Sequence, residues 1–67
     1  MIQIVLNGAS RQLTTPLTVA ALLEAEGLAG KRVAVERNGE IVPKSQHPSV
    51  AVENGDRLEI VVAVGGG

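Results

Sequence analysis

The last three residues, Gly65, Gly66 and Gly67, are the part of the sequence best suited to chemistry. They follow an apolar segment directly, and three consecutive glycines are uncommon where glycine makes up roughly 7% of residues. Glycines without Cβ let an extended backbone enter a narrow cleft and leave the terminal carboxylate sterically open. A partner enzyme can then present that carboxylate to the α-phosphate of ATP. Composition alone leaves a second interpretation open, a frayed end or an extension left by cloning.

Activation of this kind would make Gly67 the modified residue, with Gly65 and Gly66 giving access to it. A carboxylate is a poor electrophile, whereas an acyl adenylate has a good leaving group that a sulfur nucleophile can displace. The product would be a thiocarboxylate on Gly67. We expect residues 65–67 to form a flexible tail, because ordering glycine costs much conformational entropy. Residues 1–64 are then expected to form the folded domain.

The rest of the chain offers little for catalysis. Its one histidine, His47, has no Ser or carboxylate at a recognisable spacing, so we expect a surface-loop histidine rather than a catalytic or metal-binding one. Glu24 and Glu26 are two residues apart on a predicted helix and point in different directions. The sequence has no cysteine and no glycine-rich phosphate loop that opens a helix. We therefore predict no catalytic residue, no metal and no cofactor bound by this chain, with ATP used by a partner.

Length and composition limit the remaining possibilities. The 67 residues suffice for one domain, and with 45% hydrophobic residues and no aromatic residue the core must be aliphatic. A net charge of −1 without clustered Lys or Arg disfavours nucleic-acid binding. The longest apolar run, residues 60–64, is far shorter than the roughly 20 residues that span a bilayer. Because the N-terminus also lacks a basic signal-peptide region, we expect a cytoplasmic protein.

Alternation and turn residues predict the elements before the middle of the chain. Strands are expected over residues 1–6 and 10–13, joined by a tight turn at Asn7-Gly8. A helix is expected over residues 19–26, with Thr18 as its N-cap. At its end, Gly27 suits the left-handed C′ position and Leu28 can pack back on the helix in a Schellman ending.

In the second half of the chain, three further strands and one segment that is a strand or a turn of helix are predicted. Strands over residues 32–37 and 40–42 are joined at Asn38-Gly39, a polar surface loop follows over residues 44–49, and residues 50–52 form a brief strand or a turn of helix. The longest strand is predicted over residues 57–64. Its even-numbered residues, Leu58, Ile60, Val62 and Val64, are expected to face the core.

This order of elements predicts an α+β roll with a mixed four- to five-stranded sheet and one main helix packed on one face. In a β-grasp (ubiquitin-like) arrangement of this kind, the first and last strands lie side by side and parallel at the centre. On the face away from the helix, the alternation then places Val5, Ala34, Val61 and Ala63. Contiguous exposed aliphatic residues suggest a docking surface, so we predict that these residues and Val64 bind partners.

Several segments of the chain, taken with their order and the length of the chain, resemble the ThiS-type sulfur carrier proteins of thiamin biosynthesis. These proteins belong to the ubiquitin-like β-grasp superfamily. The resemblance covers essentially the whole chain. The segments that carry it are Leu6-Asn7-Gly8, Thr18 to Leu23, Val33 to Pro43, Gly55 to Val61, and Val64 to Gly67.

The resemblance implies that Gly67 is adenylated by a ThiF-type adenylyltransferase, receives sulfur that began on a cysteine desulfurase, and donates it to a ThiG-type thiazole synthase. The chain would then be a covalent carrier and a substrate of its partners rather than an enzyme. Two alternatives stay open: a MoaD-like sulfur carrier for molybdopterin synthesis, which would use Gly67 in the same way, and a non-reactive β-grasp protein-binding module.

Overall fold

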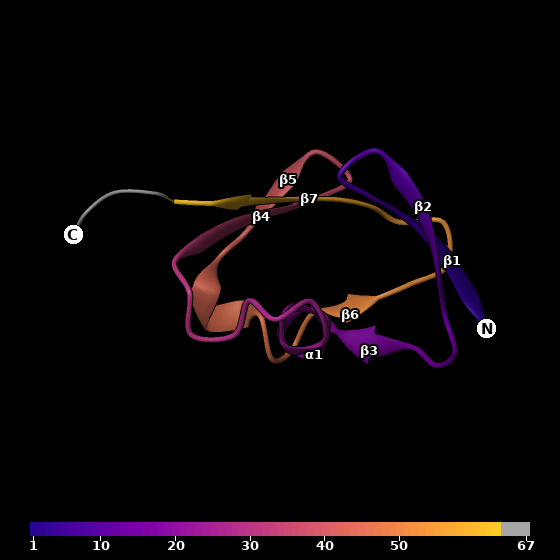
Figure 1. The fold of residues 1–67 in the computed structure, drawn as a ribbon, viewed down its shortest axis with the longest axis horizontal. Coiled ribbons are helices and arrows are strands. Elements are labelled where there is room, and N and C mark those ends of the chain that lie inside the picture. Colours follow the sequence, from indigo (N-terminus) through magenta and orange to yellow (C-terminus); the bar gives the residue numbers. More distant parts are fainter. Residues whose placement is uncertain (64–67) are drawn as a thin grey trace.

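The computed structural model describes residues 1–63, which form two layers with the helix beneath the main sheet (Figure 1). In chain order the elements are β1 (Ile2–Leu6), β2 (Ala9–Leu13), β3 (Leu17–Thr18), α1 (Val19–Ala25), β4 (Val33–Arg37), β5 (Glu40–Val42), the 3₁₀ turn η1 (Lys44–Gln46), β6 (Ala51–Val52) and β7 (Arg57–Val62).

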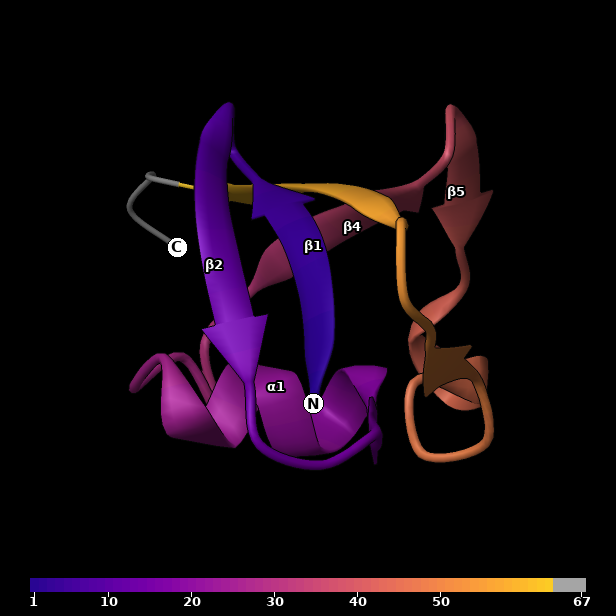
Figure 2. The same ribbon diagram turned by 90° about the vertical axis from the view of Figure 1, so that its right-hand side faces the viewer.

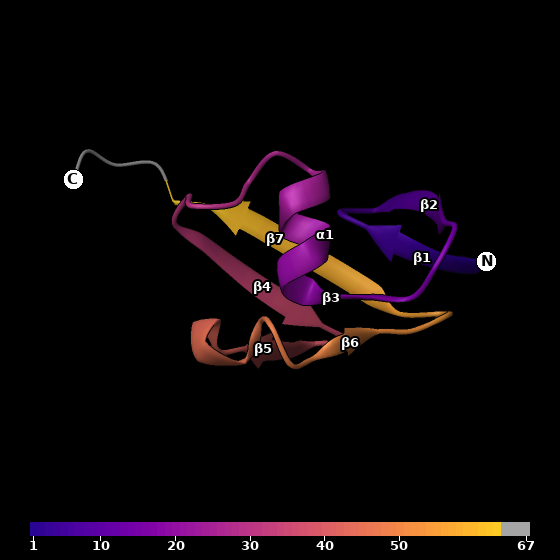
Figure 3. The same cartoon turned by 90° about the horizontal axis from the view of Figure 1, so that it is seen from below.

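The main sheet has five strands in the order β2-β1-β7-β4-β5. The first and last strands, β1 and β7, are parallel neighbours at its centre, and every other pair in the sheet is antiparallel. Within residues 1–63 the one α-helix, α1, crosses one face of this sheet (Figure 3). These features confirm the predicted α+β roll and its central parallel pair.

Both predicted Asn-Gly turns are present. Asn7 and Gly8 have φ of 50° and 82°, and Asn38 and Gly39 have φ of 53° and 85°. Two successive residues with positive φ form the kind of two-residue hairpin turn whose twist matches that of the flanking strands. The turns set the registers of the β1–β2 and β4–β5 hairpins, which stand at opposite sides of the sheet (Figure 2).

The helix begins and ends as the sequence predicts. The Thr18 hydroxyl accepts a hydrogen bond from the Ala21 N–H at 3.1 Å. At the other end Gly27 has φ of 74°, and the N–H groups of Leu28 and Gly27 donate to the carbonyls of Leu23 (2.8 Å) and Glu24 (3.0 Å). These two bonds define a Schellman ending, which satisfies carbonyls that the last helical turn leaves free.

The core lies between α1 and the sheet and is wholly aliphatic. Its buried members are Ile4, Leu6, Val19, Leu22, Leu23, Val35, Val42, Val52, Leu58 and Ile60. Leu58 and Ile60 thus face the core as predicted, but Val62 is 40% exposed, which corrects the expectation for that residue. The helix has only seven residues, and the end of β7 extends beyond the area that it covers (Figure 3). Val64 lies outside the described residues.

A second, two-stranded sheet escaped the sequence analysis in part. Residues 50–52 were predicted as a strand or a turn of helix. The structure has strand β6 there, which pairs antiparallel with β3. The short strand β3 was not predicted, because Pro16 and the N-cap Thr18 leave only two residues for it. None of the helices within residues 1–63 is long and apolar enough to cross a membrane.

Candidate functional site

The predicted reactive residue Gly67, its neighbours Gly65 and Gly66, and Val64 lie outside the described residues. The structure does describe the point from which they continue, Val62 and Ala63 at the end of β7, which we call the tail root. The Ala63 N–H donates to the Arg32 carbonyl at 2.9 Å, so the tail root is paired with the start of β4. β7 runs toward the end of the molecule opposite the N-terminus (Figure 1).

The strand that carries the tail root is held on both sides. β4 pairs with β7 over five residue pairs, from Val33 with Val62 to Arg37 with Leu58. On the other side, where β1 ends, the side chain of Asn7 continues the pairing. Its Oδ1 accepts from the Ile60 N–H at 2.8 Å and its Nδ2 donates to the Ile60 carbonyl at 3.3 Å. One amide side chain therefore satisfies both backbone groups of Ile60.

Three of the predicted docking residues gather on the outer face of the sheet, the face away from α1. Ala34 lies directly opposite Val61 in the β4–β7 register, and Ala63 follows two residues after Val61. All three are exposed, Val61 to 63%. We call these three residues the apolar patch. It includes Ala63 of the tail root, and its role in partner binding stays a prediction.

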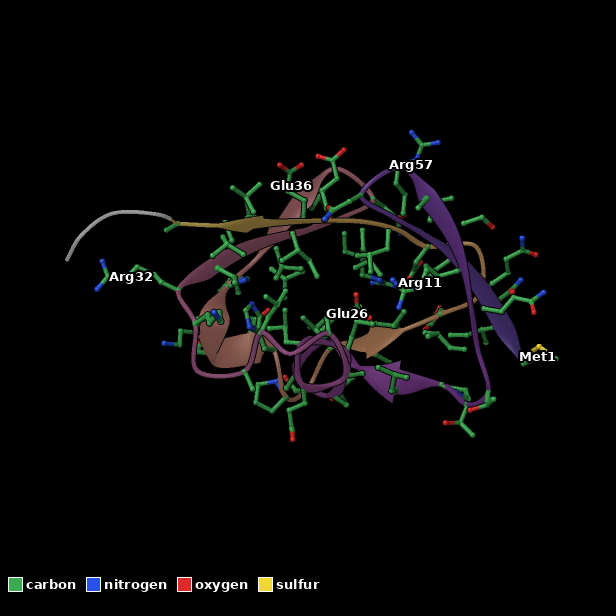
Figure 4. The ribbon with its side chains drawn as sticks, in the orientation of Figure 1. Met1, Arg11, Glu26, Arg32, Glu36 and Arg57 are labelled. Atoms are coloured by element: carbon green, nitrogen blue, oxygen red, sulfur yellow. The ribbon has the colours of Figure 1, made fainter. Side chains whose placement is uncertain are left out.

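Val5 lies apart from this patch. It is opposite Arg57 in the parallel β1–β7 register, and Arg57 is four residues, about 13 Å, before Val61. Between them lies an acidic band, in which Glu36 and Glu59 are directly opposed on neighbouring strands. Figure 4 shows Arg57 and Glu36 on this outer side of the sheet. The expectation of one patch that includes Val5 is therefore wrong, because the parallel register shifts β1 along β7.

Sequence analysis missed another exposed apolar residue on the same face. Ile41 on β5 is 64% exposed and lies opposite Glu36. The signal was present in the sequence, because Val42 faces the core and its neighbour on a strand must then face outward. Ile41 therefore lies in the same cross-strand row as Glu36 and Glu59, at the β5 end of the acidic band.

His47 is not a surface-loop histidine. The residue is only 6% exposed, and Nε2 donates to the Val42 carbonyl at 3.1 Å. Its own carbonyl accepts from the Ala20 N–H at 2.9 Å, while the Val50 carbonyl accepts from the Val19 N–H at 2.9 Å. These carbonyls and the Thr18 hydroxyl accept hydrogen bonds from backbone N–H groups that have no partner within the helix at its start. His47 is therefore buried because its segment caps α1.

A polar cluster around Asp56 joins two loops that sequence analysis treated only as turns. The Asp56 carboxylate accepts from Arg37 Nε (2.7 Å) and Nη2 (3.4 Å), from Asn38 Nδ2 (3.1 Å) and from the Glu53 N–H (2.8 Å). Burial opposes ionisation, but these bonds and the nearby Arg37 charge together hold the pKa of Asp56 below its usual value. The cluster ties the β4–β5 hairpin to the start of β7.

A second ion pair lies on the other side of the molecule. Arg11 on β2 and Glu26 at the end of α1 point toward one another (Figure 4), with guanidinium nitrogens donating to both carboxylate oxygens. The hydrogen bonds and charge of Glu26 raise the pKa of Arg11. Among residues 1–63, no three His, Cys, Asp or Glu side chains lie where they could jointly hold a metal ion.

A mixed sheet with a parallel central pair and one helix on one face defines the chain as a β-grasp domain, the fold of ubiquitin-like proteins. Within that class, the family model described as the ThiS family matches residues 4–67, and the chain belongs to the ThiS family. This match confirms the resemblance to ThiS-type proteins.

Relatives and a solved structure agree with the family match. The chain is 52% identical over 65 residues to a thiazole synthase of Paramagnetospirillum magneticum, covering 97% of this chain and 20% of the relative. It is 36% identical over 62 residues to a thiazole synthase of Magnetococcus marinus, covering 92% and 19%. The chain thus spans about a fifth of the length of these curated relatives. The crystal structure of the thiamine biosynthesis protein ThiS from Geobacter metallireducens superposes with a TM-score of 0.84 at 30% identity, covering 98% of this chain and all of that one.

Proposed function

We propose that this chain is a sulfur carrier for thiazole formation in thiamin biosynthesis and that the carboxylate of Gly67 is its working group. The observation that carries the proposal is the extent of the family match, which runs from residue 4 through the terminal glycines to residue 67. The chain is a substrate of its partner enzymes and performs no catalysis itself.

The chemistry proceeds in two steps at the terminal carboxyl carbon. A carboxylate oxygen of Gly67 attacks the α-phosphorus of ATP, giving an acyl adenylate and releasing pyrophosphate. Hydrosulfide then adds to the acyl carbon, and AMP leaves with the shared oxygen, so that a C–S bond replaces a C–O bond. The thiocarboxylate keeps sulfide covalently bound until transfer. Gly65 and Gly66 provide access, because a backbone without Cβ fits a narrow cleft.

The partners in this proposal are those that the resemblance to the ThiS family implies. A ThiF-type adenylyltransferase activates Gly67, and a ThiG-type thiazole synthase accepts the sulfur. A cysteine desulfurase provides the sulfur as an enzyme persulfide, from which a thiol reductant releases hydrosulfide while the thiol is oxidised to a disulfide. The names of the two relatives support the acceptor, since a stretch similar to this chain makes up about a fifth of each polypeptide called thiazole synthase. The same names favour thiamin over a MoaD-like role in molybdopterin synthesis.

We assign docking to the part of the outer sheet face that adjoins the end of β7. The apolar patch of Ala34, Val61 and Ala63 lies at the tail root, so an enzyme that binds Gly67 also contacts this patch. Val64 continues this surface in the proposal, whereas Val5 lies on the far side of the acidic band. Exposed contiguous apolar residues of this kind mark interaction sites in small soluble domains.

Intact mass spectrometry tests the carrier role. The chain, with Gly67 as its last residue, is incubated with a ThiF-type adenylyltransferase, ATP and a sulfide source. We expect a mass increase equal to the replacement of one terminal oxygen by sulfur. Addition of a ThiG-type thiazole synthase with its other substrates should return the original mass, as sulfur is donated.

A truncated chain without Gly66 and Gly67 is the matched control. All the buried residues of the core lie between Ile4 and Ile60, so we expect the truncated chain to keep the wild-type thermal melt and to lose the ATP-dependent mass change. Sulfur transfer that survives the truncation would refute the role of Gly67. It would leave the non-reactive β-grasp binding module as the better interpretation.

A further inference from the structure

A cavity of about 310 Å³ opens between the C-terminal end of α1 and η1, on the helix side of the sheet. Its apolar lining includes Leu23, Leu28 and Val33, and its cations are Lys31, Arg32 and Lys44. We propose that this cavity, the cationic pocket, receives an acidic segment of the enzyme that activates Gly67, with one large apolar side chain flanked by carboxylates. The inference rests on the proposed function and specifies the chemistry of the partner surface.

The end of the helix builds one wall of the pocket. Gly27 reverses the chain with its positive φ, which brings Leu28 back against the core. A second turn follows at once, in which the Lys31 N–H donates to the Leu28 carbonyl at 3.0 Å and Gly30 has φ of 81°. The two turns place exposed Lys31 beside the apolar side chain of Leu28. The sequence from Gly27 to Lys31 thus makes a mixed apolar and cationic edge.

The η1 segment builds the facing wall. Buried His47 anchors this segment through its bonds to Val42 and Ala20, so the preceding turn is fixed relative to the helix. That turn begins at Lys44, whose exposed side chain also lines the cavity. The pocket is therefore formed by two anchored segments.

Positive charge is concentrated around the pocket. The pocket lining holds three of the six basic residues of a chain whose net charge is −1, and among the residues that the structure describes Glu24 is its one acidic residue. Arg11 and Arg37 form ion pairs, but within residues 1–63 no carboxylate lies within ion-pair distance of Lys31, Arg32 or Lys44. Complementary charge directs encounter and orientation of partners, so the occupant is expected to be acidic.

The size of the pocket suits a single large side chain. Cavities that hold small molecules measure roughly 300–1,000 Å³, and this one lies at the lower end of that range. Interface anchors are typically single large apolar side chains that fill a pocket whose surroundings are polar. An apolar floor with a cationic rim matches an anchor of this kind next to carboxylates.

The position of the pocket links it to the reaction. Arg32 contributes to the lining, and its carbonyl binds the N–H of Ala63 at the tail root. Figure 4 shows Arg32 at the end of the domain toward which β7 runs. The tail root thus has the apolar patch on one side and the cationic pocket on the other. An enzyme that binds the domain around the tail root therefore contacts both the apolar patch and the cationic pocket.

Steady-state kinetics with charge variants test the inference. Pyrophosphate release by a ThiF-type adenylyltransferase is measured against the concentration of the wild-type chain and of Lys31→Glu, Lys44→Glu and Lys44→Gln. We expect each glutamate variant to raise KM on the order of tenfold, most strongly at low salt, with kcat unchanged at saturation. The KM of Lys44→Gln should lie between that of the glutamate variants and that of the wild type. Thermal melts of these exposed-site variants should match the wild type.

Arg57→Glu is the matched control. It makes the same change in charge at another exposed basic residue, on the outer face and outside the pocket lining (Figure 4). We expect its KM to stay near the wild-type value. If the wild-type chain is adenylated but the lysine variants keep its KM, or if Arg57→Glu raises KM equally, the pocket proposal is wrong and the carrier role stands. A wild-type chain that is not adenylated refutes the carrier role and, with it, this inference.

Discussion

Replacing Asp56 with alanine removes the acceptor of four hydrogen-bond contacts in one step. The carboxylate is only 7% exposed and binds Arg37, Asn38 and the Glu53 N–H. Hydrogen bonds to a charged group contribute about 1.5–3 kcal/mol each. The Arg37 side chain is 29% exposed, however, so water replaces part of what it loses. We expect a net loss of about 3 kcal/mol in the free energy of unfolding.

That loss is large for a domain of this size. At roughly 0.05–0.15 kcal/mol per residue, the whole domain is stable by about 3–10 kcal/mol. A loss of about 3 kcal/mol corresponds to a fall in Tm of about 12–24 °C. Far-UV circular dichroism is the suitable probe for thermal and urea unfolding, because the chain has no aromatic residue for fluorescence.

The pH dependence separates the charge of Asp56 from its packing. The pKa of Asp56 is lowered in the folded state, so the unfolded state binds more protons in the acid range and stability rises with pH there. The contribution is present above the unfolded value of about 3.9 and is lost as pH falls through the folded pKa. The stability difference between wild type and Asp56→Ala should therefore shrink below about pH 4.

Two further variants decide whether this reasoning holds. Asp56→Asn keeps one acceptor without the charge, so its loss should be smaller than that of alanine. Glu26→Gln breaks the more exposed ion pair with Arg11, whose side chain is 43% exposed, and should change Tm far less. A stability difference for Asp56→Ala that is equal at neutral pH and below about pH 4 would refute the electrostatic account.

Four other substitutions test the Asn7 amide, the helix cap and the two faces of β7. Asn7→Ala removes both side-chain bonds to Ile60 and should cost about 1–3 kcal/mol in urea unfolding; an unchanged midpoint would mean that water replaces the amide. Thr18→Ala removes the N-cap bond and should cost about 1 kcal/mol, measured in the same way, and no loss would show that the carbonyls around the helix start suffice. Ile60→Asp should unfold the domain by burying a charge, whereas Val61→Asp should keep its circular dichroism spectrum and Tm while weakening adenylyltransferase binding. Equal effects at both positions would contradict the assigned strand faces.

Local rules were sufficient for much of the fold. Asn-Gly pairs predicted both hairpins because the residues themselves tolerate positive φ. Thr18 and Gly27 predicted the two helix ends because capping depends on neighbours within one turn. Alternation placed Leu58 and Ile60 in the core and Val61 outside it. Each of these features depends on residues close together in the sequence.

The features that escaped prediction depend on contacts between distant residues. His47 is buried because its carbonyl reaches the start of a helix 27 positions earlier, at Ala20. Val62 is exposed because α1 stops short of it, which alternation cannot show. Val5 lies apart from Val61 because of the parallel register between the two ends of the chain. Of the candidate site, sequence located the apolar patch but not the cationic pocket, which exists only where two separate turns meet.

The central position of β7 suits the delivery of a chain end to an enzyme. When an enzyme binds the tail in a cleft, force on the tail acts on the strand that carries it. β7 is held against this force by five residue pairs to β4 and by its parallel pairing with β1. Because the pull runs along the strands, it must shear several hydrogen bonds together rather than open them one at a time. The Asn7 amide adds resistance at Ile60, near the point where β1 leaves β7. A tail carried by an edge strand would have only one such ladder, so the parallel pairing of the first and last strands gives the tail root the firmest attachment that this sheet offers.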